Sequence, residues 1–338
     1  MSRKIEITEQ VQEVMPEEKL VKKTKIDSVE DLPGVGPATA EKLKESGFDT
    51  LLSLAVASPG ELVEAGGLTE ATARKVIKAA RDTMKMGFES GDELLERRKN
   101  LLKITTGCKA FDGLLGWGFE AGGITECFGE FGSSKTQIAH QLAVNVQLSK
   151  DKGGAEGICV YIDTEGAFRP ERVKQMAEAL GLDSIQVLKN IKVARAFNSD
   201  HQMLLSEKVE DLIKNEGLNV KLVIVDSLMS HFRADFSGRG QLADRQQKLN
   251  KHMHVLSKMA TAYNLVVYVT NQVMSKPDTF FGDPTAAIGG HIVGHNSQTR
   301  IYLRKGKKGT RVAKLIDSPH LQDGEIIFNV EEGGLKDV

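Results

Sequence analysis

The arrangement of hydrophobic and polar positions changes character near residue 104. Beyond this point, short apolar runs alternate with longer stretches whose apolar residues recur at helical spacing. The runs are apolar at successive positions, as in strands buried on both faces, and lie at residues 124–128, 158–162, 191–194, 222–225 and 265–269. The helical stretches lie at residues 135–149, 171–180, 201–215 and 241–263. This alternation predicts an α/β fold with a doubly wound, mostly parallel sheet.

Three shorter apolar runs follow residue 298, at 299–304, 311–316 and 325–330. The sequence Gly-Lys-Lys-Gly at 306–309 separates the first two and is typical of a tight turn. We therefore expect these runs to form antiparallel strands at one edge of the sheet.

The segment before residue 104 divides into three parts. Residues 1–25 mix Glu and Lys without a useful apolar face, which predicts a flexible tail. Residues 26–85 place apolar side chains at helical spacings between Gly and Pro, which predicts a small all-α domain. Residues 86–103 are charged with isolated apolar positions and are interpreted as a linker. The α/β core then occupies residues 104–338.

Composition narrows the class of protein without defining its function. The chain has 338 residues, 40% hydrophobic and 27% charged, which suits a soluble protein of about two domains. A net charge of -1 gives no general attraction to nucleic acid, so any basic site must be local. The three cysteines lack metal or disulfide spacing, and no run approaches the ~20 apolar residues of a membrane span. We expect a cytoplasmic protein without a membrane partner.

A phosphate-binding loop follows the run at 124–128. The sequence GEFGSSKT at 129–136 matches G-x-x-x-x-G-K-[ST] except that Ser134 stands in place of the second glycine. Its position between a strand and a helix suits phosphate binding, because helix amides and the helix dipole favour an anion. We expect ATP to be bound by Gly129, Glu130, Phe131, Gly132, Ser133, Ser134, Lys135, Thr136 and Gln137. The alternative is a degenerate loop that binds no nucleotide.

Three polar groups follow other predicted strands at the same edge of the sheet. Asp226 ends the run 222–225, where it would lie near Mg²⁺ or simply cap a helix. Glu165 follows the run 158–162 and would orient a water, or is a solvated loop acid. Gln272 follows the run 265–269 and would sense the γ-phosphate, or closes a loop. Because carboxyl ends of parallel strands line ligand crevices, we expect these groups to meet at the phosphate loop.

Two loops are candidates for DNA contact. Residues 232–245 carry Arg233, Arg239 and Arg245 in and around a Ser-Gly-Arg-Gly stretch, which could bring an arginine close to a phosphate or is simply a solvated charged loop. Residues 273–290 form a long Gly- and Pro-containing segment, typical of a functional or a disordered loop, in which Phe280 and Phe281 could stack on bases or pack on the core. Residues 300–314 carry seven basic residues and no acid, which indicates a solvated face or contact with duplex DNA.

Together these residues resemble one family. The segments GEFGSSKTQ, YIDTEGAFRPER, ARAFNSDHQ, LVIVDS, DFSGRGQLADRQQ, TNQV, IGGHIVGH, YLRKG and IDSPHL occur in this order. They closely resemble the archaeal RadA recombinases and their eukaryotic counterparts, relatives of bacterial RecA. The resemblance implies a RecA-like P-loop ATPase core that forms filaments or rings, binds single-stranded and duplex DNA, and catalyses ATP-dependent homologous pairing and strand exchange.

The resemblance also implies roles for individual residues. Lys135 and Thr136 would bind phosphate and Mg²⁺, with Asp226 as the second acid near the metal. Glu165 would be the catalytic carboxylate and Gln272 the γ-phosphate sensor. Arg172 would stack on adenine, and Asp317 would cap the triphosphate of a neighbouring subunit, where a monovalent cation such as K⁺ could also bind. Gln322 stands where relatives often have proline, which leaves adenine packing across that interface open.

The N-terminal part and the linker carry further resemblances. The sequence LPGVGP at 32–37, with Gly34 and Gly36, resembles a helix–hairpin–helix whose amides would contact duplex DNA, or which serves packing alone. Phe88 and Gly91 occupy the family's F-x-x-A polymerisation motif, with glycine replacing alanine. His295 matches an interface residue of the family, or is a core histidine.

Two other functions compete with the recombinase. A regulatory paralogue would bind ATP and DNA without strand exchange. A filament or adaptor protein would form assemblies without meaningful hydrolysis. Recombination mediators and paralogues are further candidate partners.

Overall fold

The computed structural model describes residue 26 and residues 28–84, 88–275 and 285–338. The predicted tail, residues 1–25, lies outside the described residues. The chain divides into two compact units, Met1–Gly91 and Asp92–Val338, which are described separately below. No helix among the described residues is both long and apolar enough to cross a membrane.

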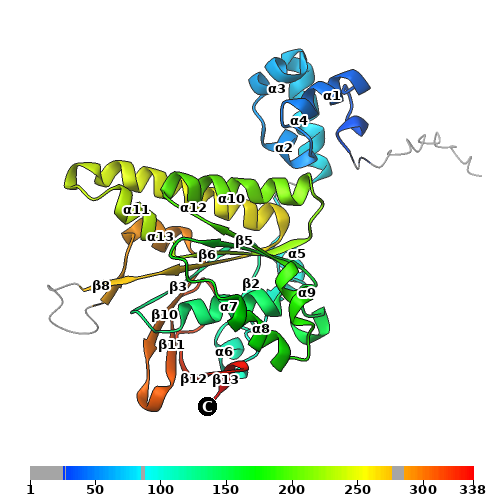
Figure 1. Ribbon diagram of the computed structural model, residues 1–338. Helices are drawn as coiled ribbons and strands as arrows, with labels where there is room; N and C mark the ends of the chain where they lie inside the picture. Colours follow the sequence, from blue (N-terminus) through cyan, green and yellow to red (C-terminus); the bar gives the residue numbers. More distant parts are fainter. Residues whose placement is uncertain (1–25, 27, 85–87, 276–284) are drawn as a thin grey trace, which may run out of the picture. The chain divides into compact units, whose positions relative to one another are not determined.

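The first unit is a small helical bundle (Figure 1). Its elements are η1 (Val29–Asp31), α1 (Pro37–Glu45), α2 (Leu51–Val56), α3 (Pro59–Gly66) and α4 (Glu70–Thr83). The apolar side chains predicted at helical spacing meet in one core, in which Leu43, Leu54, Leu62 and Val76 are fully buried. Side chains of Thr50, Ser58 and Thr69 cap the starts of α2, α3 and α4, which explains why the helices begin there.

The second unit is built on a nine-stranded sheet of order β13-β12-β11-β10-β3-β7-β6-β4-β5. The six strands from β10 to β5 are parallel: β10 (Thr299–Lys305), β3 (Ile124–Gly129), β7 (Val266–Asn271), β6 (Val220–Asp226), β4 (Ile158–Asp163) and β5 (Ile191–Arg195). The remaining three are antiparallel: β11 (Arg311–Asp317), β12 (Glu325–Glu331) and β13 (Gly334–Asp337). The predicted doubly wound, mostly parallel sheet is confirmed.

Helices cover both faces of this sheet (Figure 1). One face carries α6 (Lys109–Leu114), α7 (Lys135–Asn145), α8 (Pro170–Ala179) and α9 (Ser184–Lys189). The other carries α10 (Ser199–Lys214), α11 (Ser230–Asp235), α12 (Leu242–Tyr263) and α13 (Gly290–Asn296). Strand side chains alternate between the two layers, so that Cys159 and Tyr161 pack against the first set while Val160 and Ile162 pack against the second. This double burial explains the continuous apolar runs.

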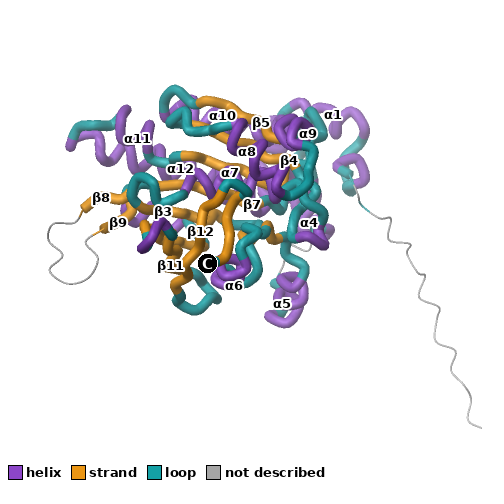
Figure 2. Tube along the Cα trace, turned by 60° about the horizontal axis from the view of Figure 1, so that its bottom comes forward, coloured by secondary structure: helices purple, strands orange, loops and turns teal. Residues whose placement is uncertain are grey.

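Several short elements were not predicted. A helix, α5 (Gly91–Lys99), lies within the predicted linker and buries none of its residues. Short β1 (Lys103–Ile104) pairs with β2 (Phe119–Glu120), and η2 (Lys150–Lys152), η3 (Arg239–Gln241) and η4 (Lys307–Gly309) are single turns. The candidate second DNA loop begins with β8 (Val273–Ser275) and ends with β9 (Thr285–Ala287), which run side by side as an antiparallel pair (Figure 2). The two- and three-residue strands and the single turns carry too few residues for a recognisable period.

A buried histidine on α12 predicts how stability depends on pH. Burial lowers the pKa of His252 from its ordinary value of 6.5 to about 4. The unfolded chain therefore takes up a proton first as pH falls, and the stabilisation present above pH 6.5 is lost towards pH 4. At pH 5 the loss is about 2 kcal/mol for this residue.

Denaturant unfolding at pH 7 and pH 5 measures this effect. We expect His252→Gln to lose about 2 kcal/mol less than the unmodified chain between these pH values. His254→Gln, at an exposed position of the same helix, is the matched control. If the free energy of unfolding depended equally on pH in all three proteins, His252 would not be the residue responsible.

Candidate functional site: a nucleotide cavity at the carboxyl ends of the strands

The phosphate loop joins β3 to α7 at the centre of the sheet. Gly129 must be glycine, because a Cβ there would lie 2.1 Å from the carbonyl oxygen of Leu303. The Lys135 ammonium lies across the loop and donates to the carbonyl oxygens of Gly129 at 2.8 Å and Glu130 at 2.9 Å. Burial lowers the pKa of Lys135, while Asp226 and Glu165 act in the opposite direction. The negative charges of Asp226 and Glu165 therefore favour the protonated, cationic form of Lys135 at the loop.

Ser134 adopts a left-handed backbone conformation, with φ of 83°, immediately before α7. A non-glycine residue in this region costs roughly 1 kcal/mol. The hydroxyl of Ser134 accepts a hydrogen bond from Nε of Arg311 on β11 at 3.0 Å. Ser134 therefore introduces backbone strain at this position. Its hydroxyl also makes a hydrogen bond with Arg311 that glycine could not make.

The loop opens onto a cavity of about 970 Å³. A volume of this size is at the upper end for small-molecule sites. The cavity brings together residues that the sequence placed at four strand ends, namely Gly129, Glu130, Phe131, Gly132, Ser134, Lys135, Thr136, Gln137, Glu165, Asp226 and Gln272. Ser133 is a fully buried residue of this loop and does not line the cavity.

Asp226 is buried at the end of β6 and accepts three hydrogen bonds. Its donors are the hydroxyls of Thr136 at 2.8 Å, Tyr161 at 2.7 Å, and Thr270. Burial and the nearby Asp226 raise the pKa of Tyr161 well above its ordinary value, so the phenol remains a donor. Asp226 is thus tied to the first turn of α7 rather than capping a helix of its own.

Glu165 and Gln272 meet in the cavity although they are far apart in the sequence. The Gln272 amide nitrogen donates to a Glu165 carboxylate oxygen at 2.9 Å. The amide oxygen of Gln272 accepts from Arg233 on α11 at 3.4 Å. These contacts connect a candidate catalytic carboxylate to a candidate DNA-binding loop.

Two supporting carboxylates were missed by sequence reasoning. Asp163 ends β4 and accepts hydrogen bonds from the backbone amides of residues 165–168 at 2.7–3.1 Å, which fixes the loop carrying Glu165. Its position two residues before Glu165 at a strand end was a usable signal. Glu126 on β3 is fully buried and accepts from Asn271 at 2.7 Å and from Arg300 at 2.7 Å. No local sequence pattern indicated that Glu126 would make these contacts.

Arg300 shows that the basic run was partly misinterpreted. It lies directly opposite Glu126 in the parallel pair β10–β3 and forms an ion pair with it. Arg304 likewise pairs with Glu325 on β12 at 2.7 Å. The expectation of a wholly solvated or DNA-facing run is therefore wrong for Arg300, whose charge compensates a buried acid.

Arg172 on α8 borders the same region. Its guanidinium donates to the side chain of Gln137 at 2.7 Å and to the carbonyl oxygens of Glu331 and Glu332. These contacts hold the side chain between α7 and the end of β12, beside the cavity wall formed by Gln137 and Val330. Arg172 itself does not line the cavity, and its contact with Gln137 places it next to a residue that does.

Asp317 and His295 lie together, away from the nucleotide cavity of their own chain. Both line a second cavity of about 510 Å³. His295 is exposed rather than part of the core, and its ring stacks on that of His291 with centroids 5.6 Å apart. Neither residue lines the nucleotide cavity of its own chain.

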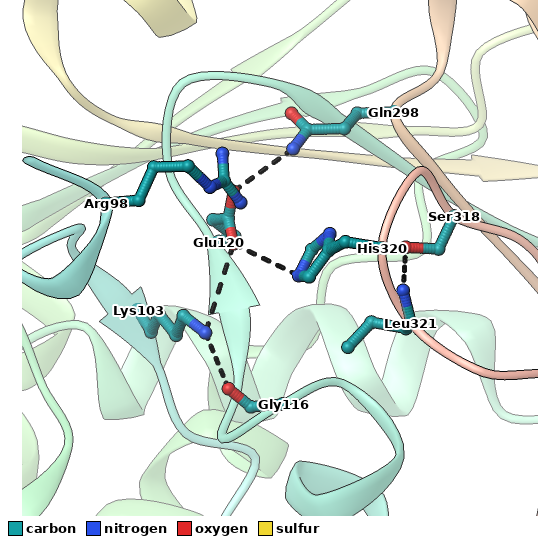
Figure 3. A network of polar contacts seen from close by, with 8 residues as sticks. All are labelled: Arg98, Lys103, Gly116, Glu120, Gln298, Ser318, His320 and Leu321. Atoms are coloured by element: carbon teal, nitrogen blue, oxygen red, sulfur yellow. Dashed lines mark hydrogen bonds and ion pairs between the residues drawn. The ribbon is translucent and has the colours of Figure 1, made fainter. Parts of the chain in front are cut away.

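The segment after Asp317 is held by Glu120 on β2 (Figure 3). The Glu120 carboxylate contacts Arg98 of α5 at 2.9 Å and Gln298 at 3.1 Å. His320 lies 3.9 Å from its second oxygen (Figure 3). One carboxylate therefore lies between α5 and the segment that follows Asp317.

The remaining predicted residues are distributed over both units. Arg233 is exposed on α11, Arg245 is half-buried on α12, and Arg239 begins η3. Phe280 and Phe281 lie outside the described residues. Phe88 is fully exposed, and Gly91 begins α5. In the first unit, Gly34 has φ of 92° and Gly36 precedes α1, so a glycine turn leads into that helix as predicted.

This fold and this cavity define a P-loop nucleotide-binding protein of the RecA-like class. A family model described as Rad51 matches residues 97–338, and one described as a SAM-like helix-hairpin-helix tandem matches residues 26–82. The chain is 51% identical over 315 residues to the "DNA repair and recombination protein RadA" of Aeropyrum pernix, covering 93% of this chain and 98% of that protein. The chain belongs to the Rad51 family, and the resemblance to archaeal RadA recombinases is confirmed.

Proposed function

We propose that the protein is an ATP- and DNA-dependent recombinase that assembles on single-stranded DNA and catalyses homologous pairing and strand exchange in DNA repair. The observation that carries the proposal is the convergence of Lys135, Thr136, Asp226, Glu165 and Gln272 on one cavity. Its relative from Aeropyrum pernix is named for DNA repair and recombination, and its family is that of Rad51.

The cavity residues fit ATP with Mg²⁺. The loop amides and Lys135 would bind the β- and γ-phosphates. The described residues hold no group of three or more His, Cys, Asp or Glu that could bind a metal by themselves. Mg²⁺ commonly uses few protein ligands and completes its shell with phosphate and water, which the Thr136 hydroxyl and Asp226 carboxylate suit. When bound, Mg²⁺ would neutralise charge on the phosphates.

Glu165 is proposed to orient and deprotonate the attacking water. Its loop is fixed by Asp163, and one of its oxygens is held by Gln272. Gln272 in turn follows Asn271, whose amide donates to the carbonyl oxygen of Ile288 near the end of the second candidate DNA loop, residues 273–290. A change in that loop would move Gln272 and therefore Glu165, which couples DNA binding to hydrolysis.

DNA contact and assembly are proposed for the other predicted residues. Arg233, Arg239 and Arg245, with Phe280 and Phe281, would contact single-stranded DNA. The glycine turn at 34–36, within the helix–hairpin–helix domain proposed for residues 26–85, would contact duplex backbone. Asp317 and His295 would face the nucleotide of a neighbouring subunit, where a monovalent cation could also bind.

Phe88 is proposed to join neighbouring subunits. It is fully exposed in its own chain, an unfavourable state for an aromatic side chain. The second unit exposes Val193 of β5 with Phe197 and Leu204 nearby in sequence, and these apolar side chains suit a receptor for it. An aromatic anchor in an apolar pocket is a common energetic centre of an interface.

We expect Phe88→Ala to shift the protein towards smaller assemblies, as light scattering at fixed concentration would show. The loss of one anchor should weaken self-association at least tenfold, or about 1.4 kcal/mol. Val56→Ala removes another exposed apolar side chain of the same unit and should leave the size distribution unchanged. Equal assembly by both variants would exclude Phe88 as the anchor.

ATP hydrolysis with and without single-stranded DNA tests the proposal, together with electron microscopy of the same mixtures. A recombinase forms filaments on DNA and hydrolyses ATP faster in its presence. A filament or adaptor protein forms assemblies without hydrolysis, and this outcome would refute the proposed enzyme. Formation of joint molecules then separates the recombinase from a regulatory paralogue.

A further inference from the structure

Two cations from the β10–β11 hairpin lie beside the phosphate loop. Leu303 of β10 is paired with Gly129 of β3, so β10 extends along the loop beyond the end of β3. Lys305, two residues further, lies close enough that a Cβ at Gly132 would be 3.2 Å from its ammonium nitrogen. Arg311 is the cross-strand partner of Lys305 and reaches Ser134 at 3.0 Å. Neither residue was predicted to belong to the nucleotide site.

Arg311 also lines the nucleotide cavity itself, together with Lys135 and Thr136. Its Nη1 group donates to the carbonyl oxygens of Gly309 at 2.6 Å and Thr310 at 3.0 Å. Among the described residues, Arg311 forms no ion pair, and its Nη2 group makes no hydrogen bond. A guanidinium with an uncompensated charge at an anion-binding loop is arranged to receive an anion.

Ser134 explains how Arg311 is held there. The left-handed backbone at this position favours glycine, which would be unstrained but would offer no side-chain acceptor. The serine hydroxyl accepts from Nε and thereby fixes the plane of the guanidinium, with Nη2 left to donate elsewhere. The strain at Ser134 is therefore accompanied by the positioning of a charged group.

We propose that Arg311 is a nucleotide-binding residue, docked on the phosphate loop by Ser134, and that it supplies a second cation beside Lys135 to the phosphate groups of the bound nucleotide. Lys305 adds positive charge at the same end of the loop, but Ser134 does not hold its side chain in place. The inference rests on the proposed function only in taking the ligand of this cavity to be a nucleoside polyphosphate.

Calorimetric titration of the full chain with ADP and Mg²⁺ tests this role. We expect Arg311→Ala and Arg311→Gln to weaken ADP binding about tenfold, or about 1.4 kcal/mol. Glutamine retains a neutral donor on a shorter side chain, whereas Arg311→Lys retains the charge and should recover at least half of the lost free energy. A purely structural role of Arg311 would not be rescued selectively by lysine. Lys307→Ala, at an exposed position of the same turn, is the control and should bind as the unmodified chain does.

The docking is tested by combining variants. Ser134→Gly removes both the strain and the acceptor, so we expect it to change ADP affinity by less than about tenfold. In that background Arg311→Ala should cost less than it does alone, because the guanidinium is no longer fixed. Additive losses in the double variant would refute the docking by Ser134.

The outcomes separate this inference from the proposed function. If the unmodified chain binds ADP and pairs DNA, while Arg311→Ala binds ADP within twofold of it, the role of Arg311 is refuted and the recombinase stands. If ADP binding depends on Arg311 as predicted but no homologous pairing occurs, the recombinase is refuted and the role of Arg311 stands.

Discussion

Replacing Lys135 by alanine is expected to abolish ATP-dependent homologous pairing. The variant should bind ATP at least about 100-fold more weakly, or about 2.7 kcal/mol. The ammonium lies within the loop on the carbonyl oxygens of Gly129 and Glu130, where phosphate oxygens would become its partners. Asp226 and Glu165 would then face the phosphates without an intervening cation. Calorimetry with ATP and an assay for joint molecules measure both effects.

A matched lysine variant gives the control for this prediction. Lys152 is exposed in η2, and Lys152→Ala should bind ATP and pair DNA normally. Undiminished pairing by Lys135→Ala would show that the cavity is not the site on which pairing depends. Circular dichroism of both variants should match the unmodified chain, since removal of one side chain from an open cavity leaves the core intact.

Glu165→Gln is expected to stop hydrolysis while leaving nucleotide binding in place. A positioned general base contributes about 10²–10⁴-fold, so turnover should fall at least about 100-fold. Glutamine has nearly the shape of glutamate and can still accept the 2.9 Å hydrogen bond from Gln272, so ATP affinity should stay within about threefold. Filaments formed with ATP should consequently persist longer, because bound ATP stabilises the assembled state.

Steady-state hydrolysis and light scattering on one sample distinguish these effects. Glu207→Gln, an exposed acid on α10, is the control and should hydrolyse ATP normally. Retention of more than a tenth of the activity in Glu165→Gln would assign the base to another group. Loss of ATP binding would instead give Glu165 a structural role.

The architecture was accessible from the sequence because its strands are buried on both faces. Runs such as 222–225 are apolar throughout, and this pattern predicted β6 and its neighbours close to their observed bounds. The short helices α11 and α13 and the strand β13 were missed, because six, seven and four residues cannot establish a period. The helix α5 was missed because it buries no apolar face.

The cavity residues were also accessible, since carboxyl ends of adjacent parallel strands must meet at one edge. Two side-chain pairs in the same part of the sheet were not predictable from the sequence. Arg311 and Ser134 are 177 positions apart, and Arg300 and Glu126 are 174 positions apart, so only the register of β10 and β11 brings each pair together. The φ of Ser134 is set by the closure of the loop onto α7, which the residue types alone do not determine.

The central claim is that ATP bound in this cavity drives homologous pairing, and D-loop formation tests it most directly. A labelled single strand is incubated with the full chain, Mg²⁺ and supercoiled duplex, with ATP, with ADP or without nucleotide. The account predicts D-loops with ATP and a homologous duplex, and none with ADP, without nucleotide or with a heterologous duplex. ATP-dependent filaments that hydrolyse ATP but yield no D-loops under these conditions would contradict it.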